Sequence, residues 1–123
     1  MTYISLKTAE QLKAWGCEVQ SECYYIEDDD FICVVREGEC LISCNEFYPF
    51  YPEAQEFKII KKTYDLHEII CDGEMAKAFF MPYNTEGQMK TVTRVILLYL
   101  QRNEQETAEQ YLLDNCIFNP ENK

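Results

Sequence analysis

The spacing of apolar side chains changes sharply along this chain, and that change limits the possible folds more than any other feature. Between residues 22 and 44 the apolar residues follow the two-residue period of extended strands. From Met89 to Leu112 they recur three and four residues apart, which is typical of amphipathic helices. A run of strands followed by helices predicts the α+β class. Because the chain has 123 residues, we expect a single α+β domain over residues 1–123.

The middle of the chain predicts a three-stranded antiparallel β-meander. Its strands are expected at Cys23–Ile26, Phe31–Arg36 and Cys40–Cys44, with residues 27–30 in one loop and Glu37 and Gly38 in the other. In that register Ile26 pairs with Phe31, and Tyr24 pairs with Cys33. Residues 57–62 could add a fourth strand. Both faces would be largely apolar, so we expect other elements to cover both sides.

Helices are expected before and after this sheet. Residues 8–15 predict a short helix with Thr8 as its N-cap, and Gly16 suits its end. Residues 65–71 predict another helix, and residues 74–81 favour one slightly. The last third predicts an αα-hairpin, with helices over residues 89–100 and 104–115 and a stop at Asn103. The predicted order is an N-terminal short helix, a three- to four-stranded antiparallel β-meander, and helices ending in a C-terminal αα-hairpin.

Acidic residues are concentrated in one part of the sequence. The formal net charge is −11, and residues 10–57 hold 12 acids and two bases, a sum of −10. This balance argues against direct binding of nucleic acid or of anionic lipid, both of which need Lys and Arg. It favours a basic protein surface as the partner, because complementary charges steer association. A solvated acidic surface that maintains solubility is the alternative.

Two groups of residues in this segment are candidate binding residues. Carboxylates could take the place of nucleic-acid phosphates, and the candidates are Glu27, Asp28, Asp29, Asp30, Glu37, Glu39 and Glu46. An aromatic loop that contains Pro49 and Pro52 could anchor a partner, and its candidates are Phe47, Tyr48, Phe50 and Tyr51. The same loop could instead fold back and cap the core. The sharpest form of this hypothesis is an inhibitor that mimics nucleic acid and blocks a basic host protein.

Cysteine and histidine usage gives a second hypothesis. There are seven cysteines, no C-x-x-C pair and no secretory signal, so we expect reduced thiols in the cytoplasm. His67 and Cys71 form an i, i+4 pair and are the weak candidates for a metal or a thiol-based site. A catalytic zinc wants three protein ligands, so no metal or cofactor is expected. The sequence leaves enzymatic activity uncertain and slightly favours a protein that is not an enzyme.

Motifs for common catalytic classes are absent. The sequence contains no G-x-G-x-x-G, no G-K-[ST] and no G-x-S-x-G. It therefore gives no support for a nucleotide-dependent enzyme or a serine hydrolase. A structural or oligomeric accessory protein is a third hypothesis, and the oligomeric state is open.

Several short segments carry a resemblance to a known group. They are Thr8-Ala9-Glu10-Gln11-Leu12-Lys13 with Gly16, Ser21-Glu22 with Tyr24-Tyr25, and Tyr64-Asp65-Leu66. Together with the Glu- and Gln-rich C-terminal helices, they resemble small cytoplasmic proteins of phages and prophage-like elements. The resemblance covers about half of the chain. It implies a bacterial cytoplasm and an accessory gene, and it brings no activity with it.

Overall fold

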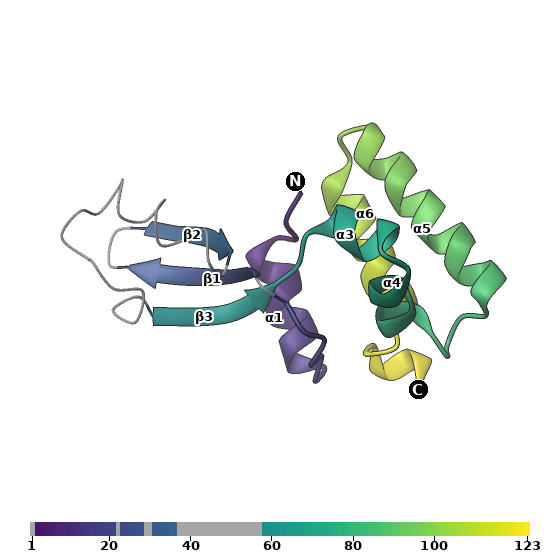
Figure 1. Cartoon of the computed structure of the whole chain (residues 1–123), viewed down its shortest axis with the longest axis horizontal. Coiled ribbons are helices and arrows are strands. Elements are labelled where there is room, and N and C mark those ends of the chain that lie inside the picture. Colours follow the sequence, from purple (N-terminus) through teal and green to yellow (C-terminus); the bar gives the residue numbers. More distant parts are fainter. Residues whose placement is uncertain (1, 22, 29–30, 37–57) are drawn as a thin grey trace.

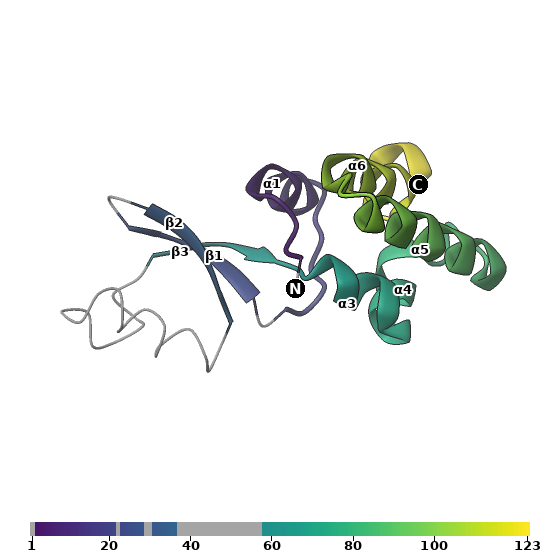
Figure 2. The same cartoon turned by 90° about the horizontal axis from the view of Figure 1, so that it is seen from above.

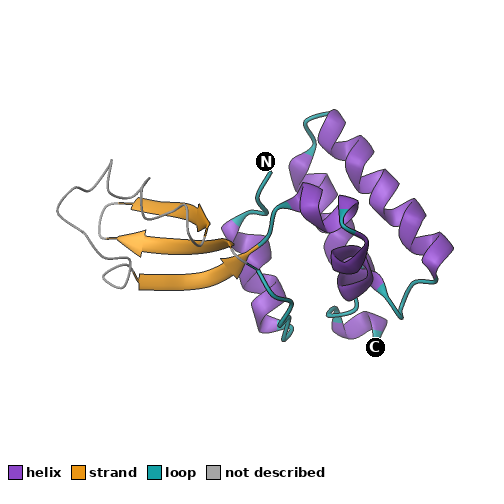
Figure 3. Ribbon diagram, in the orientation of Figure 1, coloured by secondary structure: helices purple, strands orange, loops and turns teal. Residues whose placement is uncertain are grey.

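The computed structural model describes residues 2–21, 23–28, 31–36 and 58–123. Helices make up most of this part of the chain, and three strands form one small sheet (Figure 3). The elements in chain order are α1 (Leu6–Ala14), β1 (Cys23–Asp28), β2 (Phe31–Arg36), β3 (Lys58–Thr63), α3 (Leu66–Cys71), α4 (Gly73–Phe80), α5 (Glu86–Gln101), α6 (Gln105–Asn115) and a short 3-10 turn, η2 (Pro120–Asn122).

The order of the strands is β2-β1-β3, with β1 in the middle. A meander would have its second strand in the middle, so the predicted three- to four-stranded β-meander is wrong, and the predicted fold class with it. The described residues are mostly helical. The predicted strand at 40–44 lies outside the described residues. Strand β1 pairs with both β2 and β3. The sequence offered the segment of β3 only as a fourth strand, because strand pairing depends on contacts far apart in the chain.

The hairpin of β1 and β2 has a different register from the predicted one. Its pairs include Tyr24 with Val35, Ile26 with Cys33 and Asp28 with Phe31. Strand β1 continues through Glu27 and Asp28, which leaves only residues 29–30 between the strands. The observed register therefore differs from the predicted one by two residues.

Helix α1 begins earlier than predicted. Its N-cap is Ser5, whose Oγ accepts a hydrogen bond from the backbone N–H of Thr8 at 3.3 Å. Thr8 itself lies inside the helix and is buried. The predicted end is confirmed, because Gly16 follows the helix with a φ of +84°, a conformation that favours glycine.

Two aspartates start the short helices α3 and α4. The carboxylate of Asp65 accepts a hydrogen bond from the backbone N–H of His67 at 3.0 Å. Asp72 follows α3 directly and caps α4, where it accepts hydrogen bonds from the N–H groups of Glu74 and Met75. The helices predicted at 65–71 and 74–81 are therefore confirmed.

The C-terminal pair of helices is also confirmed. Helix α5 begins with a reciprocal capping box between Thr85 and Gln88. Asn103 has a φ of 58°, which is the left-handed conformation that ends the helix and turns the chain into α6. On α6, Ala108 and Leu112 are fully buried, as their spacing predicted.

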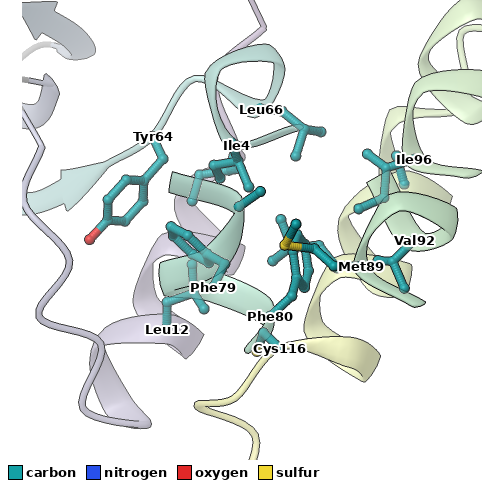
Figure 4. Close-up of a cluster of buried hydrophobic side chains, with 14 of the residues drawn as sticks. Ile4, Leu12, Tyr64, Leu66, Phe79, Phe80, Met89, Val92, Ile96 and Cys116 are labelled. Atoms are coloured by element: carbon teal, nitrogen blue, oxygen red, sulfur yellow. The ribbon is translucent and has the colours of Figure 1, made fainter. Parts of the chain in front are cut away.

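The hydrophobic core is shared by the helices (Figure 4). Its largest fully buried side chains include Ile4, Leu12, Leu66, Ile69, Phe79, Phe80, Ile96 and Leu112. Phe79 lies between two other rings and makes edge-to-face contacts with Tyr64 at 5.1 Å and with Phe118 at 5.7 Å between ring centroids. The core therefore joins α1 and the β3–α3 connection to the C-terminal helices.

The molecule is elongated, with the sheet at one end and helices α3–α6 at the other (Figures 1 and 2). Helix α1 lies between these two parts. The segment before α1 runs beside the β3–α3 connection: the N–H of Ile4 donates to Tyr64 O at 3.0 Å, and Tyr3 bridges to Asp65. This contact fixes where α1 starts and brings its first turn against α6.

Candidate functional site

A groove between α1 and α6 joins distant parts of the described chain. Its volume is about 550 Å³. Its α1 wall is formed by Ser5, Lys7, Thr8, Gln11 and Trp15, and its α6 wall by Gln105, Glu106, Glu109, Gln110 and Leu113. We call it the α1–α6 groove. A volume of this size lies within the range of small-ligand and side-chain pockets.

A buried carboxylate lies at the foot of this groove. Glu109 is only 5% exposed. Its Oε1 accepts two hydrogen bonds from Ser5, from the backbone N–H and from Oγ, each at 2.9 Å. Its Oε2 accepts one from Gln105 Nε2 at 2.8 Å. All three donors are neutral, so the hydrogen bonds hold the carboxylate in place without cancelling its charge.

The mouth of the groove adds one more carboxylate, one cation and one aromatic ring. Glu106 is exposed on the α6 wall, and Lys7 is exposed on the α1 wall. Trp15 is half-buried and is the chain's only tryptophan. The lining therefore holds two carboxylates against one ammonium group. An indole ring near carboxylates suits a ligand cation, because the ring face attracts positive charge.

The carboxylates predicted as binding residues are only partly within the described chain. Glu27 and Asp28 belong to β1. The predicted residues Asp29, Asp30, Glu37, Glu39, Glu46, Phe47, Tyr48, Phe50 and Tyr51 lie outside the described residues.

Strand β3 changes how the acidic segment should be interpreted. Its register places Lys58 opposite Glu27, and it places Lys61 and Lys62 opposite two tyrosines of β1. In the sequence these lysines follow the acidic segment, whereas in the fold they occupy the strand beside it. Strand β3 therefore brings three lysines beside β1, which contains Glu27 and Asp28.

The His67 and Cys71 pair does not form a metal site in the described chain. His67 Nδ1 lies 3.9 Å from Asp65 Oδ1 and makes no hydrogen bond. Cys71 is exposed and lines a shallow groove of about 270 Å³ beside Lys90 and Arg94. Among the described residues, no group of three or more His, Cys, Asp or Glu side chains could hold a metal ion.

Two other thiols are held in their neutral form. Burial raises the pKa of Cys17, and a hydrogen-bonding contact with Tyr64 Oη at 3.5 Å opposes this shift. Burial also raises the pKa of Cys116, which is part of the core. A raised pKa lowers the thiolate fraction, so neither is suited to act as a nucleophile at neutral pH.

Sequence reasoning missed both Ser5 and Glu109. They are 104 positions apart, so no local motif connects them. One signal was present: Glu109 follows the buried Ala108 and lies one turn after Gln105 on the inner face of a predicted helix. An acid at such a position needs donors from elsewhere in the fold.

Comparisons with known proteins identify no family for this chain. No family model, no curated protein and no solved structure matches the chain. In the described part of the chain, no helix is both long enough and apolar enough to span a bilayer.

Proposed function

We propose that this chain is a small binding protein that holds a basic segment of a partner protein in the α1–α6 groove. The observation that carries the proposal is the Glu109 carboxylate, which is buried at the foot of the groove and bonded only to neutral donors among the described residues. A positive group that enters the groove would find a negative charge that is already desolvated and oriented.

An arginine side chain suits this groove better than a lysine. Its planar guanidinium can stack on an indole ring such as that of Trp15, or it can donate two parallel hydrogen bonds to a carboxylate such as that of Glu106. An ammonium group is a compact point charge that cannot do both equally well. The partner is therefore expected to present an exposed arginine.

The charge of the whole chain supports the same partner. A net charge of −11 attracts a basic protein over distance and accelerates encounter at low ionic strength. The proposal includes the cytoplasm as the setting, and a phage or mobile element as the source. The hypothesis of a nucleic-acid mimic is not needed for it, since the groove uses two carboxylates rather than a long acidic surface.

Trp15 allows a direct test by fluorescence, since it lines the groove and is the chain's only tryptophan. The purified chain would be titrated with a short neutral peptide that carries one arginine, and with the same peptide carrying glutamine instead. We expect a saturable change with the arginine peptide only, and a weaker response at high salt because charge attraction is screened. Equal responses to the two peptides would contradict the proposal.

Variants at exposed positions test whether binding occurs in the groove. Glu106→Gln should weaken binding of the arginine peptide several-fold, and Lys7→Gln should strengthen it, because the first removes attraction and the second removes repulsion. Glu121→Gln is the matched control: it removes one exposed carboxylate from η2, outside the residues that line the groove. If all three variants bind alike, the site lies elsewhere.

A further inference from the structure

The α1–α6 groove has two chemically different ends. The N-cap of α1, Ser5, bonds to Glu109 in the first half of α6, and Gln105 at the start of α6 donates to Tyr3 O. The two helices therefore begin at the same end of the groove and run in the same direction (Figure 1). We call this end, which holds the carboxylates of Glu106 and Glu109, the carboxylate end.

The opposite end is apolar. Trp15 is the C-cap of α1, and Leu113 lies in the last turn of α6. Both residues line the groove, and both are half-buried because one part of each side chain packs against the core. Neither side chain carries a charge. We call this end, defined by Trp15 and Leu113, the apolar end.

Two helical turns separate these ends. Leu113 follows Glu106 by seven positions on α6, and Trp15 follows Thr8 by seven positions on α1. Seven residues of an α-helix span about 10 Å. An arginine that donates to Glu106 therefore leaves Trp15 and Leu113 to a second side chain of the same partner.

Charge decides which end of the groove takes the arginine. Hydrogen bonds from a guanidinium to a carboxylate are charge-assisted, and they are stronger than the stacking of a cation on an exposed aromatic ring. The buried charge of Glu109 adds attraction at the same end. A large apolar side chain suits the apolar end, because it removes apolar surface from water and leaves no charge unpaired there.

The walls of the groove favour a helix as the bound segment. Because the backbone groups in the middle of α1 and α6 bond within their own helices, the walls offer no strand edge to an extended segment. A helix satisfies its own backbone when it leaves water, so it needs no such edge. Side chains seven positions apart lie on one face of a helix, about 10 Å from each other, which matches the separation of the two ends.

A second copy of this chain is a poor occupant of the groove. Each copy has a formal net charge of −11, so two copies repel each other over distance. A basic partner is attracted by the same charge.

We propose that the α1–α6 groove binds an amphipathic helix of a basic partner, which presents an arginine to the carboxylate end and a large apolar side chain, seven positions away, to the apolar end. This inference rests on the proposed function, since it starts from an arginine in the groove. It adds the helical form of the partner, the second side chain and the spacing between the two.

Three helical peptides of equal length and charge test the spacing by calorimetric titration of the full chain. Each carries one arginine. The first has a leucine seven positions from it, the second has the leucine five positions from it on another face, and the third has alanine in place of leucine. We expect the first peptide to bind about five- to twentyfold more tightly than the other two, since only its leucine reaches the apolar end. Circular dichroism should show that it gains helix on binding.

The outcomes separate this inference from the proposed function. Equal affinities of the three peptides would overturn the inference and leave the arginine site standing, and so would binding of the first peptide without a gain of helix. A fourth peptide, with glutamine in place of the arginine of the first, tests the proposed function itself. If it binds as tightly as the first, or if none of the peptides binds, both are contradicted.

Leu113→Ala tests where the leucine of the peptide binds. It should weaken the first peptide about three- to tenfold and leave the alanine peptide unchanged, whereas Glu106→Gln should weaken both. Leu98→Ala is the matched control, because Leu98 is an exposed leucine of α5 outside the residues that line the groove.

Two further results would overturn the inference. One is an unchanged affinity of the first peptide for a Leu113→Ala variant whose circular dichroism shows that it is folded. The other is a dimer of the unmodified chain, seen by light scattering, that Leu113→Ala dissociates, since a second copy would then occupy the groove. If Leu113→Ala does not fold, the peptide comparison decides by itself, because it leaves the protein unaltered.

Discussion

Ser5 and Glu109 are joined by two hydrogen bonds of 2.9 Å, although they lie 104 positions apart in the chain. The same serine caps the first turn of α1 by accepting from the N–H of Thr8. One side chain thus starts a helix and fixes that helix against α6. A further side-chain hydrogen bond, from Gln105 Nε2 to Tyr3 O at 2.8 Å, joins α6 to the segment before α1.

Loss of the Ser5 hydroxyl should destabilise the fold. Ser5→Ala removes the N-cap and one of the three hydrogen bonds to the Glu109 carboxylate, and we expect the free energy of unfolding to fall by about 1–2 kcal/mol. Urea denaturation would measure it. Thr93→Ala, which removes an exposed hydroxyl from the middle of α5, should change stability by less than about 0.5 kcal/mol. Equal effects of the two variants would argue against the link.

Phe79 should be among the most sensitive positions of the core. It is fully buried between the rings of Tyr64 and Phe118. We expect Phe79→Ala to lower the free energy of unfolding by about 3–5 kcal/mol, since it removes a large apolar side chain and leaves a cavity. Leu98→Ala is the comparison, because Leu98 is 47% exposed, and its cost should be far smaller. The midpoint of thermal unfolding would show the difference; similar midpoints would mean that the Phe79 ring is not packed as described.

Replacing each of two glycines with alanine should change the free energy of unfolding in opposite directions. Gly16 has a φ of +84°, so Gly16→Ala should lower the free energy of unfolding by about 1 kcal/mol, although nothing lies close to the added methyl group. Gly87 lies in the first turn of α5 with open space around it, so Gly87→Ala should raise stability by about 0.5–1 kcal/mol. Chemical denaturation of both variants checks the signs. A stabilising Gly16→Ala would contradict the helix end described for α1.

Three of the cysteines should differ in their rates of alkylation. Cys71 is exposed, whereas burial raises the pKa of Cys17 and Cys116. A raised pKa means less thiolate at neutral pH, so iodoacetamide should label Cys71 before Cys17 and Cys116. Labelling of Cys17 and Cys116 should keep increasing at pH values above the ordinary thiol pKa. Mass spectrometry of the digested protein gives each rate. In strong denaturant the three labelling rates should converge. If Cys116 were labelled as fast as Cys71 in the native protein, Cys116 would not be buried in the core as described.

The helices could be predicted because their signals are local. Apolar residues at helical spacing placed α5 and α6, and Gly16 and Asn103 marked helix ends where the backbone needs a positive φ. Asp65, a suitable N-cap, likewise predicted the start of α3. The start of α1 was missed because Ser5 and Thr8 are both suitable caps, and the choice between them depends on Glu109, which is far away in the sequence.

The pairing of strands in the sheet could not be predicted from local signals. Alternating residues identified β1 and β2 but not the third partner, and β3 joins β1 across a gap of 29 residues between Asp28 and Lys58. The predicted candidate residues in that interval include the aromatic loop, and they lie outside the described part of the chain. The α1–α6 groove was not anticipated, since it combines residues from two helices that are distant in the sequence.

By itself the sequence determined the helices, two strands and the total charge, because helix periodicity, caps and charge are properties of neighbouring residues or of simple counts. Only the tertiary structure decided which strand pairs with β1, that the lysines of β3 lie beside the acidic strand, and that the Glu109 carboxylate is buried against Ser5. The reason is that pairing and burial depend on which distant segments meet in the folded chain.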